Sequence, residues 1–229
     1  MKLSIVVPVY NSSKIIEDSY EKFKEVAEKI TKDYEILFRD DFSKDNSKNI
    51  LSKIVKKDKK VKISLNDKNY GLGYTLRNLF KDASGRYVVY FDMDAPLSFD
   101  LDNFPIFLDK CDDCYSVIAS RYVENPLLPF SRWFVSEFYY VINKILFNIN
   151  IRDIGSGFVI FKKEALDILD LNCDGFDIHI EIFAKLQKNG FNVKEVPVAY
   201  RHWTGGSFRI FKHGPKTLFN TFKLWRKII

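Results

Sequence analysis

Apolar and polar positions along the first hundred residues alternate in a pattern typical of successive strands and helices. Short apolar runs rich in β-branched and aromatic residues predict four strands, at Leu3–Tyr10, Tyr34–Asp40, Val61–Asn66 and Arg86–Asp92. Apolar residues at three- and four-residue spacing predict helices between them, at Lys14–Ile30, Asn46–Lys56 and Tyr74–Ala83. This order predicts an α/β fold with a mostly parallel central sheet and helices on both of its faces.

The second half of the chain is less regular. It contains three predicted strands, at Tyr115–Arg121, Phe158–Phe161 and Asn192–Tyr200. Predicted helices lie at Ser131–Asn148, Glu164–Leu169 and Phe176–Lys188, and Pro215 is expected to open a last helix. No repeat or linker interrupts the chain, so we expect one domain over residues 1–211, with halves 1–100 and 101–211, and an amphipathic helix at 212–229.

Polar residues gather where the predicted strands of the first half end. They are Pro8-Val9-Tyr10-Asn11, Arg39-Asp40-Asp41, Asn69-Tyr70-Gly71 and Asp92-Met93-Asp94. Right-handed crossovers bring the carboxyl ends of parallel strands to one edge of the sheet, where open α/β sheets bind ligands. One nucleotide site explains the four clusters better than four coincidences.

Asp92 and Asp94 carry the strongest chemical signal. Two residues apart on an extended chain, their side chains face the same way, and their charges repel unless a cation lies between them. Carboxylate pairs suit Mg²⁺ or Mn²⁺, which commonly take a diphosphate as a further ligand. The alternative is a solvated strand end. A second such pair, Asp100 and Asp102, is expected to cap a helix.

Two neighbouring motifs fit the same site. A carboxylate of Asp40 or Asp41 could accept hydrogen bonds from a base or ribose, or could cap the next helix. Gly71 and Gly73 allow close approach of another backbone, and the helix that follows them begins with N–H groups that favour anions.

Charge and cysteine content narrow the class of protein. The formal net charge is +6, and seven of the 36 Lys and Arg residues lie in Val196–Ile229, a segment without Asp or Glu. This excess suggests a phosphate-bearing partner: nucleic acid, a lipid surface or an anionic substrate. Three cysteines suggest reduced thiols in a cytosol, and Cys111 and Cys114 lack the second pair of a zinc site. No apolar run is long enough for a spanning helix.

Four segments of the first half, taken in order, resemble the family 2 inverting glycosyltransferases, which have the Rossmann-like GT-A fold. They are Ile5–Asn11, Arg39–Ser47, Asn69–Asn78 and Ala83–Asp94. The second half is similar to the dolichyl-phosphate mannose synthases and related polyprenyl-phosphate sugar transferases, in Ala119–Tyr122, Arg152–Leu166, Gly175–Phe191 and Val196–Arg209.

This resemblance implies a role for each matching residue. Pro8, Tyr10 and Asn11, with Asn69 and Gly71, would line the pocket of a GDP-mannose or UDP-glucose type donor; Asp40 would meet the base beside Asp41. Asp92 and Asp94 would bind the metal. The residues near the diphosphate or acceptor phosphate would be Arg121, Arg132, Ser156, Arg201 and Arg209. The catalytic residues would be Asp94, Arg121 and Arg201. The chain departs from the family pattern at Ser12, where Glu is frequent, and at Phe42, where Gly is usual. Ala95-Pro96-Leu97 is closer to the dolichyl-phosphate glucose synthases.

The acceptor can be argued from the charged residues. A hydroxyl acceptor needs a general base, whereas a phosphate is already anionic and needs cations, preferably arginine. The arginines of the second half favour a polyprenyl phosphate; a carbohydrate acceptor with Asp177 or Glu181 as base is the alternative. A non-catalytic nucleotide-sugar binder stays open. Acidic residues at the ligand edge do not suit binding of nucleic acid, so we expect no nucleic-acid partner.

The last predicted helix has two interpretations. Its apolar residues Leu218, Phe219, Phe222, Trp225 and Ile229 are flanked by Lys216, Lys223, Arg226 and Lys227. Such a helix lies in a membrane interface or packs on its own domain, and Ser131–Asn148 has the same ambiguity. We expect a cytoplasmic protein held peripherally on the cytoplasmic face of a membrane.

Overall fold

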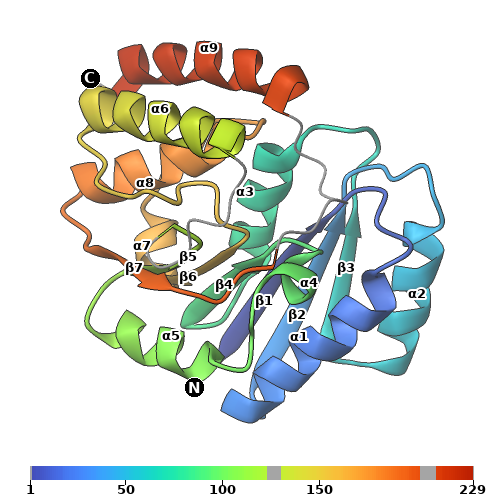
Figure 1. Cartoon of the computed structure of the whole chain (residues 1–229). Helices are drawn as coiled ribbons and strands as arrows, with labels where there is room; N and C mark the ends of the chain where they lie inside the picture. The colour runs from blue at the N-terminus through green and yellow to red at the C-terminus, as the bar shows by residue number, and fades with distance from the viewer. Residues whose placement is uncertain (1, 123–129, 202–209, 229) are drawn as a thin grey trace.

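A sheet runs through the part of the chain that the computed structural model describes, residues 2–122, 130–201 and 210–228, with backbone alone at 130–133, 210–213 and 228 (Figure 1). Its strands are β1 (Leu3–Val9), β2 (Tyr34–Asp40), β3 (Val61–Leu65), β4 (Tyr87–Phe91), β5 (Ser116–Ser120), β6 (Phe158–Lys162) and β7 (Val193–Pro197). They lie in the order β3-β2-β1-β4-β6-β5-β7. All neighbours pair in parallel except those of β6, which runs antiparallel to β4 and β5. The predicted mostly parallel sheet is confirmed.

Helices cover both faces of the sheet. They are α1 (Ile16–Ile30), α2 (Ser47–Lys57), α3 (Leu72–Asp82), α4 (Ala95–Ser98), α5 (Phe104–Asp112), α6 (Phe130–Phe147), α7 (Lys163–Asp167), α8 (Ile178–Lys188) and α9 (Ile210–Ile228). Apolar residues of α1, α2 and α5 form one core with the sheet, and those of α3, α7 and α8 form the other. Burial of these two apolar layers drives the sandwich of helices around the sheet.

Two helices lie outside this sandwich. Figure 1 shows α6 and α9 side by side on the outer side of α8. Tyr139 of α6 and Thr221 of α9 share a hydrogen bond of 3.2 Å between their hydroxyl groups, and Leu224 of α9 is buried against the α8 side of the core. Phe219 and Phe222 of α9 stay exposed. Within the described parts of the chain, none of the helices combines the length and apolar character needed to cross a bilayer.

Several predicted boundaries are wrong. The last helix begins at Ile210 rather than at Pro215, which lies in its second turn and removes one backbone hydrogen bond without ending the helix. β7 ends at Pro197, because proline has no N–H for the ladder; Tyr200 instead bridges to Phe99.

The second acidic pair is not a simple helix cap. Asp100 accepts a hydrogen bond from the backbone N–H of Asp102, but α5 begins only after Asn103. Asp102 pairs with Lys22 and Lys29 of α1. This pair therefore joins two surface elements and is not part of the ligand edge.

Candidate functional site

The carboxyl end of β4 places Asp92 against a neighbouring strand. Its backbone N–H donates to the Gly157 carbonyl at 2.8 Å, and its Oδ1 accepts a hydrogen bond from the hydroxyl of Tyr90. A Cβ at position 157 would lie 2.4 Å from Asp92 Oδ2, so only glycine leaves room for this carboxylate. Asp94 follows two residues later as the residue that precedes α4. The strand end therefore holds one fixed carboxylate beside a second one.

The electrostatic surroundings of this pair suit a cation. Burial and the neighbouring Asp94 raise the pKa of Asp92 to about 6. Burial also raises the pKa of Asp94, and the Arg121 guanidinium partly opposes both shifts. The described residues contain no cluster of three or more His, Cys, Asp or Glu side chains able to hold a metal. A divalent ion at Asp92 and Asp94 would need further ligands from substrate or water, as Mg²⁺ sites commonly do.

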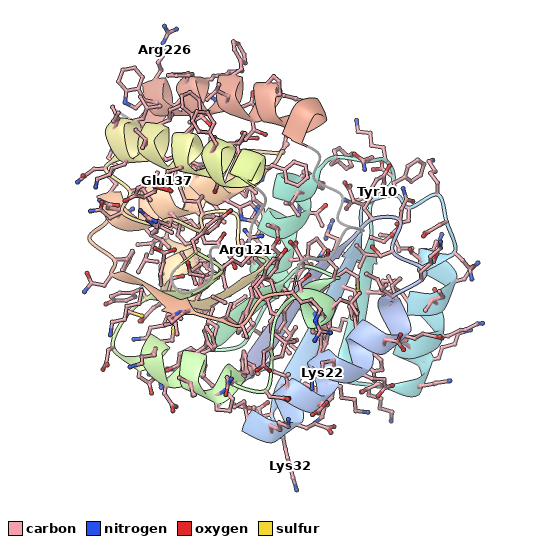
Figure 2. All side chains as sticks on the ribbon, viewed as in Figure 1. Tyr10, Lys22, Lys32, Arg121, Glu137 and Arg226 are labelled. Carbon is pink, nitrogen blue, oxygen red and sulfur yellow. The ribbon has the colours of Figure 1, made fainter. Side chains whose placement is uncertain are left out.

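Arg121 follows β5 and is held in a fixed orientation. Its Nε donates to Asp153 Oδ2 at 2.8 Å, its Nη2 contacts Asp153 Oδ1, and the same Nη2 donates to the Gly155 carbonyl at 3.2 Å. Asp153 is almost fully buried and its backbone N–H is bound by Glu195. Figure 2 shows Arg121 near the middle of the molecule. The structure thus brings Arg121 close enough to Asp92 and Asp94 to act on their charges. Its guanidinium is at the same time paired with the Asp153 carboxylate.

The other predicted phosphate-site residues have different outcomes. The backbone N–H of Arg201 donates to the Ser98 carbonyl at 2.7 Å, which holds Arg201 beside the end of α4, and its side chain is exposed. Ser156 is fully buried, and its hydroxyl donates to the Ala119 carbonyl at 2.7 Å. This hydroxyl already has a backbone partner inside the protein, and the role of Ser156 at the acceptor phosphate stays a prediction. The side chain of Arg132 and the whole of Arg209 lie outside the described residues.

The end of β1 is joined to the loop after β2. The backbone N–H of Asn11 donates to Ser43 Oγ at 2.8 Å, and its Oδ1 accepts from the Lys44 N–H at 2.7 Å. Asn11 therefore shapes this loop with its side chain. Pro8 is half-buried, and Tyr10 is 43% exposed and lies at the periphery of the molecule (Figure 2).

The adjacent acids Asp40 and Asp41 behave differently. Asp40 Oδ2 accepts from the Ser43 N–H at 3.1 Å, whereas its buried Oδ1 has no hydrogen-bond partner among the described residues. Asp41 is fully engaged: it accepts from the backbone N–H groups of Tyr70 and Gly71 and from the Asn66 amide, each at 2.8 Å. Asp40 is left with an open acceptor, while Asp41 anchors the loop before α3.

The same loop corrects one prediction. Gly71 has φ +98°, and a Cβ there would lie 2.5 Å from the Asp174 carbonyl oxygen. That oxygen accepts the Gly73 N–H at 2.7 Å. The glycines do permit close backbone approach, as predicted, but the first turn of α3 binds a protein carbonyl rather than an open anion site. Asn69 contributes by donating from its amide to the Asp41 carbonyl at 3.2 Å.

The backbone at Phe42 shows why glycine is usual at this position in the family. Its φ of 64° lies in the left-handed region, which glycine enters without steric cost and a phenylalanine does not. The Lys44 ammonium lies 3.5 Å from the centre of the Phe42 ring, a cation–π contact that helps to hold this conformation.

The two candidate bases serve the fold. Glu181 is 1% exposed and accepts the backbone N–H groups of Asn172 and Cys173, while Lys185 donates to it at 2.8 Å. Asp177 is 6% exposed and accepts from the Asn220 amide of α9 at 3.2 Å. The structure contradicts a base role for Glu181, since its lone pairs are occupied and it is shielded from solvent.

Sequence reasoning missed two residues of the site. Tyr90 lies two positions before Asp92 on the same strand, a spacing that predicts a shared face. His179 of α8 lies with its ring 5.7 Å from that of Tyr90, and burial together with the Arg121 charge lowers its pKa to about 4. No sequence signal marks His179, because only the packing of α8 brings it there.

A mostly parallel sheet with paired acids at its carboxyl edge is typical of α/β proteins that bind a ligand at that edge. Residues 4–169 match the profile described as glycosyl transferase family 2, and the chain belongs to this family. It is 30% identical over 207 residues to the dolichol-phosphate mannosyltransferase of Pyrococcus furiosus, covering 87% of this chain and 56% of that protein. It is 26% identical over 206 residues to the undecaprenyl-phosphate 4-deoxy-4-formamido-L-arabinose transferase of an Enterobacter species, covering 88% and 59%. The chain spans less than two thirds of either relative.

Solved structures show the same fold. Glucosyl-3-phosphoglycerate synthase from Mycobacterium tuberculosis, bound to UDP, matches with a TM-score of 0.72 at 14% identity, over 99% of this chain and 79% of that one. The mannosyltransferase PcManGT from Pyrobaculum calidifontis, bound to GDP-Man and Mn²⁺, matches with a TM-score of 0.58 at 15% identity, over 85% and 54%. These matches confirm the predicted GT-A fold.

Proposed function

We propose that this chain transfers a hexosyl group from a nucleoside-diphosphate sugar to a polyprenyl phosphate, with inversion at the anomeric carbon. An oxygen of the acceptor phosphate attacks that carbon, the new carbon–oxygen bond forms, and the bond to the diphosphate breaks. The nucleoside diphosphate carries away the electron pair. The observation that carries the proposal is the exposed arginine, Arg201, whose backbone N–H is bound at the end of α4, the short helix that begins directly after Asp94.

The donor end of the proposed site rests on Asp40. A buried carboxylate oxygen without a partner is costly, and a base or ribose N–H or O–H would satisfy it. Tyr10, being exposed at the next strand end, offers a ring for the same nucleotide. A GDP-mannose or UDP-glucose type donor fits these groups, and both relatives named above are polyprenyl-phosphate or dolichol-phosphate sugar transferases.

Asp92 and Asp94 would hold the divalent cation, Mg²⁺ or Mn²⁺. When bound, such an ion offsets the charge that develops on the departing diphosphate. The raised pKa values of both carboxyls support this role, because burial, and for Asp92 also the Asp94 charge, disfavours the ionised form, and a bound cation would offset that cost.

The acceptor end supports a phosphate rather than a hydroxyl. Glu181 is occupied by structural hydrogen bonds, and Asp177 is buried with one oxygen bound to the Asn220 amide, which argues against either carboxylate as the base. Arg121 and Arg201 supply the positive charge that an anionic acceptor needs. A lipid acceptor also fits the outer helices.

The surface formed by α6 and α9 is apolar and edged with positive charge. On α6, Phe134, Phe138 and Val141 are exposed and line a shallow pocket with Glu137. On α9, Phe219 and Phe222 are exposed, and Figure 2 shows Arg226 pointing away from the molecule. Such a surface suits peripheral attachment to an anionic membrane, where the lipid acceptor resides.

A transfer assay tests the proposal. GDP-mannose and UDP-glucose are each offered with a polyprenyl phosphate in detergent, with and without Mn²⁺. We expect one donor to give a glycosyl lipid, and Asp94→Ala to abolish the product. Arg201→Ala should cost about 2–4 kcal/mol of transition-state stabilisation. Arg86→Ala, an exposed arginine before β4, is the matched control and should leave the rate unchanged.

Two results would contradict the proposal. Glycosylation of a carbohydrate in place of the lipid, lost in Asp177→Asn but kept in Arg201→Ala, would establish the hydroxyl acceptor. Donor binding without any transfer or hydrolysis would identify a non-catalytic binder.

A further inference from the structure

Tyr90 is a buried phenol at the base of the candidate site. It is 1% exposed and lies in β4 between Val6 of β1 and Val159 of β6, its partners in the strand register. The ring of His179 packs against it from α8 with centroids 5.7 Å apart. The phenol therefore has little freedom to rotate.

The hydroxyl of Tyr90 has a specific partner. It donates to Oδ1 of Asp92, two residues along the same strand. Phe161 of β6 and Phe183 of α8, which belong to the same core as Tyr90, show that this core accepts phenyl rings without a hydroxyl. Packing alone is therefore no reason for a tyrosine here, and a buried hydroxyl requires an acceptor such as Asp92.

The contact restrains the direction of the Asp92 carboxylate. The Tyr90 hydroxyl donates to Oδ1 of Asp92 on one side, and on the other side Oδ2 lies in the space that is left because Gly157 has no side chain. Asp94 differs, since its side chain makes no capping hydrogen bond to α4. The site thus pairs a carboxylate held on two sides with one that makes no capping contact to the helix after it.

We propose that Tyr90 is a positioning residue that orients the Asp92 carboxylate toward a divalent cation. The inference rests on the proposed function, in which these acids hold the ion. Hydrogen-bond partners of metal-ligating side chains commonly change metal affinity by about 10–100-fold when they are removed. We expect a change of this size when the Tyr90 hydroxyl is deleted.

The chain offers a matched control on the same strand. Tyr87 is also a buried tyrosine of β4, 1% exposed, and its hydroxyl donates to Asp112 at the other end of the strand. Its side chain belongs to the core on the opposite face of the sheet. Tyr87→Phe and Tyr90→Phe remove the same group from comparable surroundings, but only Tyr90→Phe removes it from Asp92.

The experiment measures Mn²⁺ binding to the whole protein without turnover. The paramagnetic resonance signal of free Mn²⁺ is titrated in the presence of GDP or UDP for the wild type and both variants. We expect Tyr90→Phe to bind Mn²⁺ at least about 10-fold more weakly, and Tyr87→Phe to bind it as the wild type does. In the transfer assay, higher Mn²⁺ concentrations should restore the turnover of Tyr90→Phe. Thermal unfolding of both variants confirms that they are folded.

Each other outcome decides against the inference. Unchanged Mn²⁺ affinity in Tyr90→Phe, with normal binding by the wild type, overturns the role of Tyr90 alone. Equal weakening in both variants also overturns it, because general loosening of the strand would then be the cause. If the wild type binds no Mn²⁺ with either nucleotide, the metal part of the proposed function fails and this inference fails with it.

Discussion

Gly157→Ala should disable the acidic site without unfolding the protein. The added Cβ would lie 2.4 Å from Oδ2, 2.7 Å from Cγ and 2.8 Å from Cβ of Asp92. Rotation of the carboxylate alone cannot relieve these contacts, since Cβ of Asp92 is itself too close. The whole side chain must move away from the position in which Tyr90 holds it.

The size of the effect follows from this overlap. Ordinary contact begins near 3.4 Å, so the oxygen and the new methyl must separate by roughly 1 Å. A displacement of that size at reacting groups can cost about 100-fold in rate. Overpacking of a buried site should cost about 1–3 kcal/mol of folding free energy. We therefore expect a folded protein with lower Mn²⁺ affinity and turnover reduced by about two orders of magnitude.

The matched control lies two residues away. A Cβ at Gly155 meets nothing within 4 Å, so Gly155→Ala should leave turnover, Mn²⁺ affinity and stability close to the wild type. Transfer rate, Mn²⁺ titration and urea unfolding are measured for both variants. Wild-type turnover and Mn²⁺ affinity in Gly157→Ala would refute the reasoning, because the Asp92 carboxylate would then not need this position.

Three further predictions concern other parts of the molecule. In the folded protein, the pKa of His179 is about 4, whereas in the unfolded chain it is near 6.5. The unfolded chain therefore takes up a proton first as the pH falls. About 3 kcal/mol of the free energy of unfolding is present above pH 6.5 and is lost as the pH falls toward 4. His179→Leu should flatten the fall in unfolding free energy over that range, and equal slopes would disprove the assignment. Glu181→Gln should lower the free energy of unfolding by about 3 kcal/mol yet keep the turnover of the folded fraction; a dead but stable variant would restore Glu181 as a base. Serine at both Phe219 and Phe222 should weaken salt-sensitive co-sedimentation with anionic vesicles, whereas Ile106→Ser on α5 should not, and equal losses would reject the α6–α9 surface.

The regular half of the fold could be predicted because its signals are local. Strand β2 spans Tyr34–Asp40 as predicted, and the alternation of strands and helices before it and after it implies parallel pairing. Parallel pairing in turn brings the polar strand ends to one edge, as the sequence indicated for Asp40, Asp92 and their neighbours. The insertion of β6 between β4 and β5 has no local signal, since it depends on which strand edges remain free once the parallel half has formed.

The sequence by itself therefore determined the parallel half of the sheet, the family pattern and the edge at which the chemistry lies. Only the tertiary structure decided which polar groups remain free there. Asp40 and Asp41 are adjacent carboxylates of the same type, yet Asp41 is saturated by Asn66 and Gly71, which lie 25 and 30 positions away. From the sequence, Glu181 and Ser156 could each contact a ligand, but in the folded protein their side chains are hydrogen-bonded to backbone groups of other segments. The reason is physical: a side chain's chemistry depends on how many of its lone pairs and protons are already satisfied, and distant segments supply those partners only when the chain is folded.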